Sequence, residues 1–169
     1  MSKKLYLVRH ATAEEGGAMF RDMDRELISK GIMEAARMGK QLKDAAVQVD
    51  AIMSSPAVRA FETAKIVAEQ LRFDVDNIST NEALYGGGPR GYLSTLNSIP
   101  SAVQSAMIVG HNPDITFFGE YLTKHALGFS METASVIVIS LPNELQWSEV
   151  SENTCTFVAY ESLAATGTL

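Results

Sequence analysis

Two histidines and two arginines in this sequence have the side chains that phosphoryl chemistry uses. Arg9 and His10 are adjacent, whereas Arg59 and His111 follow far along the chain. Arginine presents a planar fork of N–H donors that matches phosphate oxygens, and neutral imidazole is a nucleophile once its other ring nitrogen is fixed by an acceptor. Since a buried core does not accept this much unpaired positive charge, the four side chains together indicate a site that binds and attacks a phosphoryl group.

The three segments that carry these residues share one position relative to the predicted elements. Residues 9–13, 54–59 and 110–113 each follow a short apolar strand and precede a helix or a loop. The carboxyl ends of parallel strands form one edge of an open sheet, and ligands bind there. Either histidine alone is more often a loop residue or a capping partner, so the interpretation depends on their joint occurrence.

Strands and helices alternate over most of the chain. Short apolar runs predict strands at residues 4–9, 50–54, 75–79, 106–109, 135–140 and 155–160. The spacing of apolar residues predicts helices over about residues 30–47, 55–71, 91–99 and 113–124. Gly86 to Gly91 is expected to form a mobile loop over the site. The alternation predicts an α/β domain with a largely parallel sheet, and the two late strands, which no helix separates, predict an antiparallel hairpin.

Length and composition suit a globular protein with one domain. The 169 residues are 46% apolar and 20% charged, which is not the composition of a disordered chain. We expect a single domain over residues 1–163 and a loose tail over residues 164–169. The formal net charge of −6 argues against nucleic-acid binding, which favours a basic surface.

The chain is expected to be a cytoplasmic monomer that does not bind a membrane. No apolar run approaches the ~18 residues that a membrane-spanning helix needs. The apolar start of the chain is interrupted by Arg9 and His10, so it reads as a first strand and not as a signal peptide. The single cysteine, Cys155, excludes an internal disulfide and is consistent with the reducing cytoplasm.

Three motifs resemble those of the histidine phosphatase (phosphoglycerate mutase-like) superfamily. Residues 7–11 (LVRHA) resemble its first-strand signature, although Ala11 stands where glycine is usual. Residues 54–64 resemble its second motif and residues 109–113 (VGHNP) its third, and residues 24–31 resemble the SixA-type phosphohistidine phosphatase branch. The resemblance implies a phosphoglycerate mutase-like fold, which is a three-layer sandwich with a mostly parallel central sheet flanked by helices.

The resemblance assigns roles to the four side chains. His10 is the nucleophile that attacks phosphorus and forms a phosphohistidine intermediate, which water then hydrolyses. Arg9 and Arg59 hold the non-bridging oxygens, where charge is spread in a loose transition state. His111 donates to the same oxygens and is expected to be protonated when substrate is bound, because a nearby dianion favours the imidazolium form.

Further polar residues are candidates for substrate contacts around the site. Arg25 would lie at the rim of the phosphate site or else be a surface charge in a loop. Thr12 would orient His10 or simply end the strand, and Asn112 is a candidate substrate contact that also suits a helix cap. Arg90 would reach phosphate from the glycine-rich loop.

Glu82 is the acidic residue available as a proton donor. Many enzymes of the superfamily carry such an acid after the middle strand, and Glu82 is the only acidic residue between Asp76 and Asp114. It is either that donor or a neighbour of the pocket. Imidazole, with a reference pKa near ~6.5, leaves more readily than an alkoxide. Hydrolysis of phosphohistidine therefore depends less on proton donation by a general acid than hydrolysis of a phosphomonoester does.

Two other patterns are not expected to bind a cofactor or a metal. Residues 86–91 match the dinucleotide fingerprint, but Pro89 removes a backbone donor from the turn that would cradle pyrophosphate. The three histidines of the chain lack the short spacing of metal ligands. The expected chemistry therefore uses neither a metal nor an organic cofactor.

The sequence predicts a phosphatase that dephosphorylates phosphohistidine on a partner protein. One alternative is a small-molecule phosphomonoesterase of the same superfamily, which would act on a small phosphorylated metabolite. The other is a non-catalytic phospho-recognition module. A pure binding module has no need of a nucleophile, so the presence of His10 beside Arg9, together with Arg59 and His111, speaks against the module.

Overall fold

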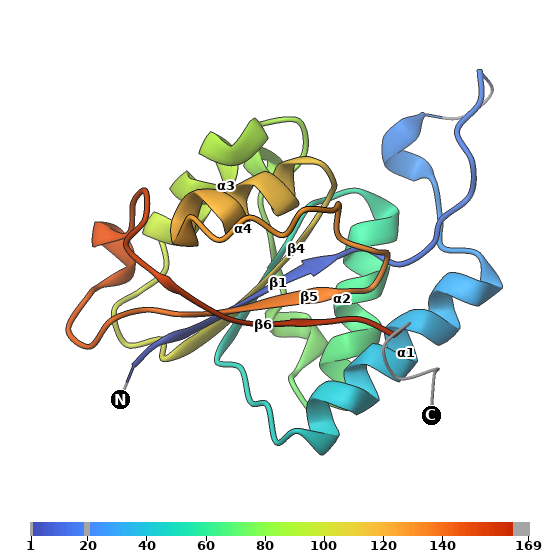
Figure 1. The fold of residues 1–169 in the computed structure, drawn as a ribbon. Helices are drawn as coiled ribbons and strands as arrows, with labels where there is room; N and C mark the ends of the chain where they lie inside the picture. The colour runs from blue at the N-terminus through green and yellow to red at the C-terminus, as the bar shows by residue number, and fades with distance from the viewer. Residues whose placement is uncertain (1, 19–20, 164–169) are drawn as a thin grey trace.

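The computed structural model describes residues 2–18 and 21–163 as a mixed α/β fold (Figure 1). The expected tail at residues 164–169 lies outside the described residues. The strands are β1 (Lys4–Arg9), β2 (Ala51–Ser54), β3 (Ser79–Thr80), β4 (Ser105–Gly110), β5 (Val136–Ser140) and β6 (Thr156–Glu161). The helices are α1 (Ser29–Asp44), α2 (Val58–Gln70), α3 (Gly88–Asn97) and α4 (Asp114–Thr123), and the 3-10 turns are η1 (Asp22–Asp24), η2 (Val75–Asn77), η3 (Glu82–Leu84) and η4 (Trp147–Glu149).

The six strands form one sheet in the order β3-β2-β4-β1-β5-β6. The pairings β1–β4, β2–β4 and β2–β3 are parallel, whereas β1–β5 and β5–β6 are antiparallel. The expected late hairpin is therefore confirmed as β5–β6. The chain passes from β1 to β2 through α1, from β2 to β3 through α2 and from β3 to β4 through α3, so a helix lies in each connection between the parallel strands.

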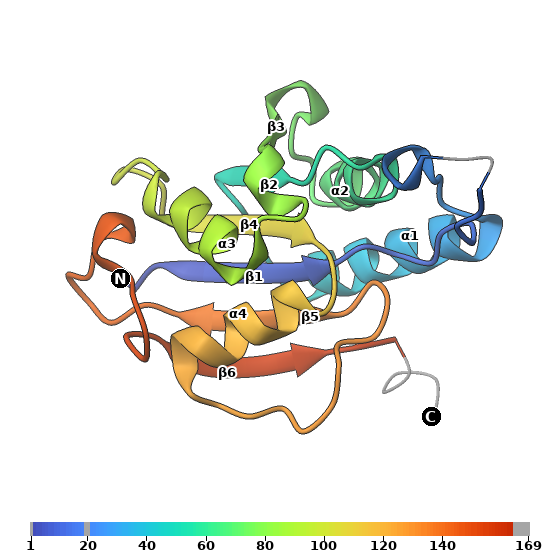
Figure 2. The same ribbon diagram turned by 90° about the horizontal axis from the view of Figure 1, so that it is seen from above.

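Helices cover both faces of the sheet, so the fold has three layers (Figures 1 and 2). Leu5 and Leu7 of β1 belong to the apolar cluster that also contains residues of α3 and α4, whereas Tyr6 and Val8 belong to the cluster that contains residues of α1 and α2. Alternate residues of a strand point to opposite faces, which explains why a continuous apolar run serves both clusters. The predicted three-layer, phosphoglycerate mutase-like architecture is confirmed.

Two details of the predicted elements are wrong. Residues 75–77 form the 3-10 turn η2, and only Ser79 and Thr80, both exposed, form the strand β3. The glycine-rich segment 86–91 is not a loop throughout, since α3 begins at Gly88. Pro89 occupies the first turn of that helix, where its missing N–H costs nothing.

Close packing around the first strand brings α1 against the residues that follow it. A Cβ atom at Gly31 of α1 would collide with the carbonyl oxygen of Thr12. The helix therefore lies directly against the segment after β1, and glycine is required at this contact. This contact fixes the backbone next to His10.

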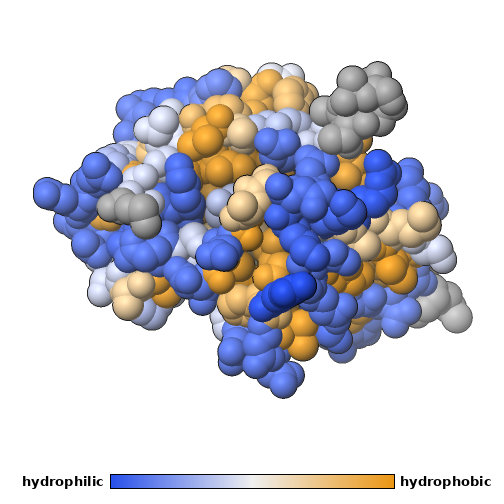
Figure 3. Space-filling view, turned by 90° about the horizontal axis from the view of Figure 1, so that it is seen from below, coloured by the Kyte–Doolittle hydropathy of each residue, from blue (hydrophilic) through white to orange (hydrophobic). Residues whose placement is uncertain are grey.

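The surface of the described residues is mixed in character. Figure 3 shows hydrophilic residues with apolar patches between them on the face seen from below. Within the part of the chain that the structure describes, no helix has the length and apolar character to cross a bilayer.

Candidate active site

The register of the sheet brings the two histidines together. Arg9 at the end of β1 pairs with Gly110 at the end of β4, so His10 and His111 are the next residues on two adjacent parallel strands. The His10 backbone N–H also donates to the Gly110 carbonyl at 3.0 Å. The two imidazole rings lie with their centroids 5.2 Å apart and tilted by 58°. The expected convergence at the carboxyl edge of the sheet is therefore observed for these rings.

One nitrogen of His10 is fixed by the backbone. Its Nδ1 lies 2.7 Å from the carbonyl oxygen of Ala11. Because a carbonyl only accepts, Nδ1 carries the proton and Nε2 keeps its lone pair. The Ala11 N–H in turn donates to the Thr63 hydroxyl of α2 at 3.0 Å, so the segment after β1 is held by a helix. This is the tautomer that a nucleophilic imidazole needs.

His111 is held from two sides. Its backbone N–H donates to the Tyr92 hydroxyl at 2.9 Å, and its Nε2 lies 2.7 Å from the Ser55 hydroxyl. Ser55 follows β2 and is fully buried. The sequence predicts Ser55 as part of a helix start, and its hydroxyl does accept from the Ala57 N–H at 3.2 Å, but α2 begins only at Val58.

Arg59 lies in the first turn of α2, with only 7% of its side chain exposed. Its two terminal nitrogens donate to Asp22, at 2.7 Å to the backbone carbonyl and 3.0 Å to the carboxylate. Arg9, at the end of β1, donates from Nη1 to the Met131 carbonyl at 2.7 Å. Both guanidinium groups are therefore anchored by the protein at one end.

Three nitrogens around the two rings have no partner in the protein. They are Nε of Arg9, Nε of Arg59 and Nδ1 of His111, all fully buried. In residues 2–18 and 21–163 the only other such side-chain atom is Oε1 of Gln146. Buried polar groups are nearly always paired, so a cluster of three indicates a ligand with several acceptors. Phosphate oxygens meet this requirement.

Burial and neighbouring cations keep both imidazoles neutral. Burial lowers the pKa of His10 to about 4; the hydrogen bond to Ala11 opposes this shift, and the charges of Arg59, Arg9 and Arg25 add to it. Burial, His10 and Arg59 lower the pKa of His111 to about 3. A neutral His10 at pH 7 is the form that attacks phosphorus.

Arg25 shares the Asp22 carboxylate with Arg59, and Thr12 comes two residues after His10. The guanidinium of Arg25 donates to the Glu14 carbonyl at 2.7 Å and to the Asp22 carboxylate at 2.8 Å. Thr12 donates from its hydroxyl to the Glu34 carboxylate at 2.7 Å, and its N–H donates to the same oxygen at 2.9 Å. Thr12 therefore ties the segment after His10 to α1, whereas Arg25 lies toward the rim.

The other candidates have partners or surroundings of their own. Asn112 bridges the Met131 carbonyl and the Thr116 hydroxyl, so its side chain does not cap α4. Arg90 lies within α3 and, with Pro89, Leu93 and Tyr121, lines a separate cavity of about 310 Å³. Arg90 was expected to reach the site from a mobile loop. That loop is not present at Arg90, because the residue lies in the first turn of α3.

The Glu82 side chain is exposed at the start of η3 and makes no hydrogen bond or ion pair with the described residues. Its assignment as a proton donor stays a prediction. Within the described ranges, no three His, Cys, Asp or Glu side chains are grouped so that they could hold a metal ion.

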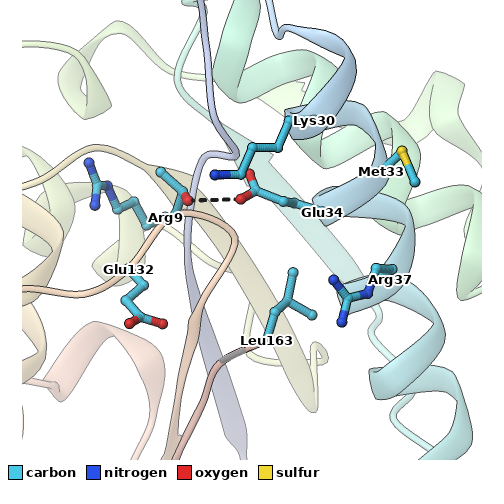
Figure 4. Close-up of a pocket in the computed structure, with 8 residues that line it drawn as sticks. Arg9, Lys30, Met33, Glu34, Arg37, Glu132 and Leu163 are labelled. Carbon is cyan, nitrogen blue, oxygen red and sulfur yellow. Dashed lines mark hydrogen bonds between the residues drawn. The ribbon is translucent and has the colours of Figure 1, made fainter. Parts of the chain in front are cut away.

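A cavity of about 770 Å³ lies beside the site, between the end of β1 and α1 (Figure 4). Lys30, Glu34 and Arg37 of α1 line one side of it, and Arg9 and Glu132 lie on the other. Figure 4 shows the Arg9 side chain extending away from the three residues of α1. The cavity is therefore a neighbour of the histidine pair and does not include either ring.

Sequence reasoning missed Asp22 and Tyr85. The Tyr85 ring stands edge-on to His111, with centroids 5.6 Å apart, and its hydroxyl donates to Asp22 at 2.6 Å. No local pattern marks either residue, because both reach the site from loops whose paths depend on the tertiary structure. The contacts of Tyr85 with His111 and of Asp22 with Arg59 are seen only in the tertiary structure.

Binding of a dianion is expected to carry at least one proton into the site. Both imidazoles are neutral above about pH 5, given the lowered pKa values of His10 and His111. A bound dianion favours the imidazolium form. Because the bound state then holds a proton that the free state lacks, affinity for sulfate should rise as the pH falls from about 8 to about 5, by up to about tenfold per pH unit.

Isothermal titration calorimetry in buffers of different ionisation enthalpy measures this proton uptake. The variant His111→Gln should take up less, since an amide does not titrate. Sulfate binding that is independent of pH and of the buffer would contradict the prediction, and would mean that His111 donates as a neutral ring while Ser55 donates to its Nε2.

Comparisons with known proteins agree with this geometry. Residues 5–84 match the model of the histidine phosphatase superfamily (branch 1). An uncharacterized protein from Picosynechococcus sp. is 26% identical over 144 residues, which cover 82% of this chain and 84% of that protein. A structure from Agrobacterium tumefaciens, assigned as a phosphohistidine phosphatase SixA, is 25% identical with a TM-score of 0.78 and covers 95% of this chain and 97% of that one. The protein histidine phosphatase SixA complexed with tungstate has a TM-score of 0.82 at 20% identity, over 96% and 99% of the two chains, which is a likeness of fold.

Proposed function

We propose that this chain, whose residues 5–84 match the histidine phosphatase superfamily (branch 1), removes the phosphoryl group from phosphohistidine on a partner protein. The observation that carries the proposal is the pair of imidazoles with three unpartnered buried nitrogens around them. In the first step the Nε2 lone pair of His10 attacks phosphorus and the P–N bond of the substrate breaks. The substrate ring carries a proton on its other nitrogen, so it leaves as neutral imidazole. Water then attacks the phosphorylated His10, the ring leaves as neutral imidazole because Nδ1 keeps its proton, and both protons of the water depart with orthophosphate as H₂PO₄⁻.

Electrostatic stabilisation comes from groups that the fold already holds in place. The transferred phosphoryl group spreads its charge over three oxygens in a loose transition state. Arg59 and Arg9 present N–H groups from anchored guanidiniums, and His111 presents Nδ1. Donors that are fixed before the reaction cost no reorganisation during it.

The acidic groups near the site favour a leaving group that needs little protonation. The hydrogen bonds from Tyr85 and Arg25 hold the pKa of Asp22 well below its usual range, which makes that carboxyl a poor proton donor. The Glu82 side chain is exposed and makes no hydrogen bond or ion pair within the described residues. Imidazole is a better leaving group than an alkoxide, so this site suits a phosphoramidate better than a phosphomonoester.

A comparison of substrates tests the proposal. Turnover of a histidine-containing protein domain that has been phosphorylated with phosphoramidate is compared with turnover of phosphoserine peptides, sugar phosphates and an aryl phosphate. We expect kcat/KM for the phosphohistidine protein to exceed the others by at least about 100-fold, equivalent to about 2.7 kcal/mol of differential transition-state binding. The variant Glu82→Gln should leave phosphohistidine turnover unchanged.

Two outcomes would overturn the proposal. A preference for a small phosphomonoester, lost together with phosphohistidine turnover in Glu82→Gln, would identify Glu82 as an ordinary general acid and the chain as a phosphomonoesterase. Tight binding of phosphorylated ligands without turnover would identify a phospho-recognition module instead.

A further inference from the structure

Asp22 holds both terminal nitrogens of Arg59. Its backbone carbonyl accepts from Nη1 at 2.7 Å, and its carboxylate oxygen Oδ2 accepts from Nη2 at 3.0 Å. The Asp22 side chain is 50% exposed, whereas that of Arg59 is 7% exposed. Asp22 therefore lies on the solvent side of the guanidinium and fixes its outer end.

The same carboxylate accepts hydrogen bonds from two further side chains. Tyr85 donates to Oδ2 at 2.6 Å, and Arg25 donates to Oδ1 at 2.8 Å. Asp22 lies in η1, Arg59 lies in the first turn of α2 and Tyr85 follows η3, so one carboxylate joins three segments that are distant in sequence. Tyr85 also stands edge-on to His111, which places this network directly beside the histidine pair.

The contacts of Asp22 leave one edge of the Arg59 guanidinium, the edge that carries Nε, available to a ligand; we call it the inner edge. Nε of Arg59 is buried and has no partner, in company with Nδ1 of His111 and Nε of Arg9. A guanidinium has five N–H groups in a rigid plane, so fixing the outer end fixes the direction of the inner edge. Arg25 pairs the Asp22 charge at the other oxygen, which leaves the charge of Arg59 less fully offset.

We infer that Asp22 is a positioning residue for phosphoryl binding, which acts by orienting Arg59 and does not itself touch the substrate. The inference rests on the proposed function, since it assigns Arg59 to the phosphoryl group. Without the carboxylate, Arg59 retains the hydrogen bond from Nη1 to the Asp22 carbonyl but loses the one from Nη2, so the plane of the guanidinium is no longer fixed at two atoms. The guanidinium then samples orientations that no longer present the inner edge to the phosphoryl group.

The experiment is a double-mutant cycle with Asp22→Ala, Arg59→Lys and the double variant, read out as sulfate affinity and as kcat and KM on the best substrate. Asp22→Ala alone should weaken sulfate binding and lower kcat/KM by about 10-fold to about 100-fold, the range of one charge-assisted hydrogen bond. In the Arg59→Lys background the same change should have little further effect, because residues that act through one another are not additive. The thermal unfolding midpoint of each variant is measured in parallel.

A matched control is Asp24→Asn, two residues away in the same 3-10 turn. Asp24 is exposed and approaches only Arg21, at 3.9 Å, so its change should leave sulfate affinity and turnover as they are. Tyr85→Phe removes one hydrogen bond to Asp22 while keeping the ring beside His111, and should give a smaller loss than Asp22→Ala.

The outcomes separate this inference from the proposed function. Equal losses from Asp22→Ala in both backgrounds would overturn the positioning role, and tighter sulfate binding would show that the carboxylate competes with anions for Arg59. Sulfate affinity is measured without catalysis, so the cycle decides the role of Asp22 even when none of the substrates is turned over. Absent turnover in the native chain would count against the proposed function alone.

Discussion

Replacing His10 by alanine is expected to abolish turnover, with a fall in kcat of at least about 10⁴-fold, as for the loss of a nucleophile in other covalent hydrolases. No other described group offers the phosphoryl site an imidazole with a fixed Nδ1 proton and a free Nε2 lone pair. The native chain should accumulate a phosphohistidine that is stable in alkali and labile in acid, and mass spectrometry of a quenched reaction should place it on His10. The variant should show neither the adduct nor turnover.

The third histidine provides the control. His125 is exposed and stacks on Phe157 with ring centroids 3.9 Å apart, well outside the contacts of the site. His125→Ala should keep full activity and the adduct. Because the His10 side chain makes one hydrogen bond with the described residues, to Ala11, its removal should change the unfolding midpoint little. An adduct that persists in His10→Ala would mean that another residue is the nucleophile.

Replacing Arg59 by lysine is expected to lower kcat/KM by about 10²-fold to 10³-fold, the effect of losing one preorganised donor to a transition-state oxygen. Lysine keeps the charge but has no planar fork, so it does not satisfy Asp22 at two points while presenting an inner edge to phosphate. The loss should appear for every phosphorylated substrate, since the phosphoryl group is common to all of them. Steady-state kinetics on two substrates of different leaving group measure it.

Arg72→Lys is the matched control for this change. Arg72 follows the last turn of the same helix α2 and is exposed, so the conservative substitution should leave kinetics and stability unchanged. Near-native kinetics in Arg59→Lys would show that the charge alone suffices and that the fork geometry of the guanidinium is not used. A selective loss for one substrate would place Arg59 against the leaving group instead.

Much of the fold followed from patterns within the chain. Continuous apolar runs such as residues 4–9 identified buried strands, because both faces of a parallel sheet are covered. Alternation with helices then set the fold class. The weak edge strand and the start of α3 were misjudged, since two-residue strands and glycine-rich helix starts depend on tertiary contacts more than on local propensity.

The sequence alone indicated which residues are candidates for the chemistry. Arg9, His10, Arg59 and His111 stand out because each lies at or after the end of a strand, and parallel strands end at one edge. The pairing of Arg9 with Gly110 then makes His10 and His111 neighbours. That step follows from the register, which the apolar pattern of each strand fixes to within the period of two residues.

Only the tertiary structure decided how those side chains are held. The proton on Nδ1 of His10, the Ser55 hydroxyl beside His111 and the Asp22 carboxylate behind Arg59 are contacts between segments far apart in sequence. Hydrogen bonds of this kind depend on distances of a few tenths of an ångström and on the paths of loops, and neither is encoded in hydrophobic periodicity or in motif spacing. For this reason the candidate catalytic residues could be identified from the sequence, whereas the groups that orient them were identified only from the folded chain.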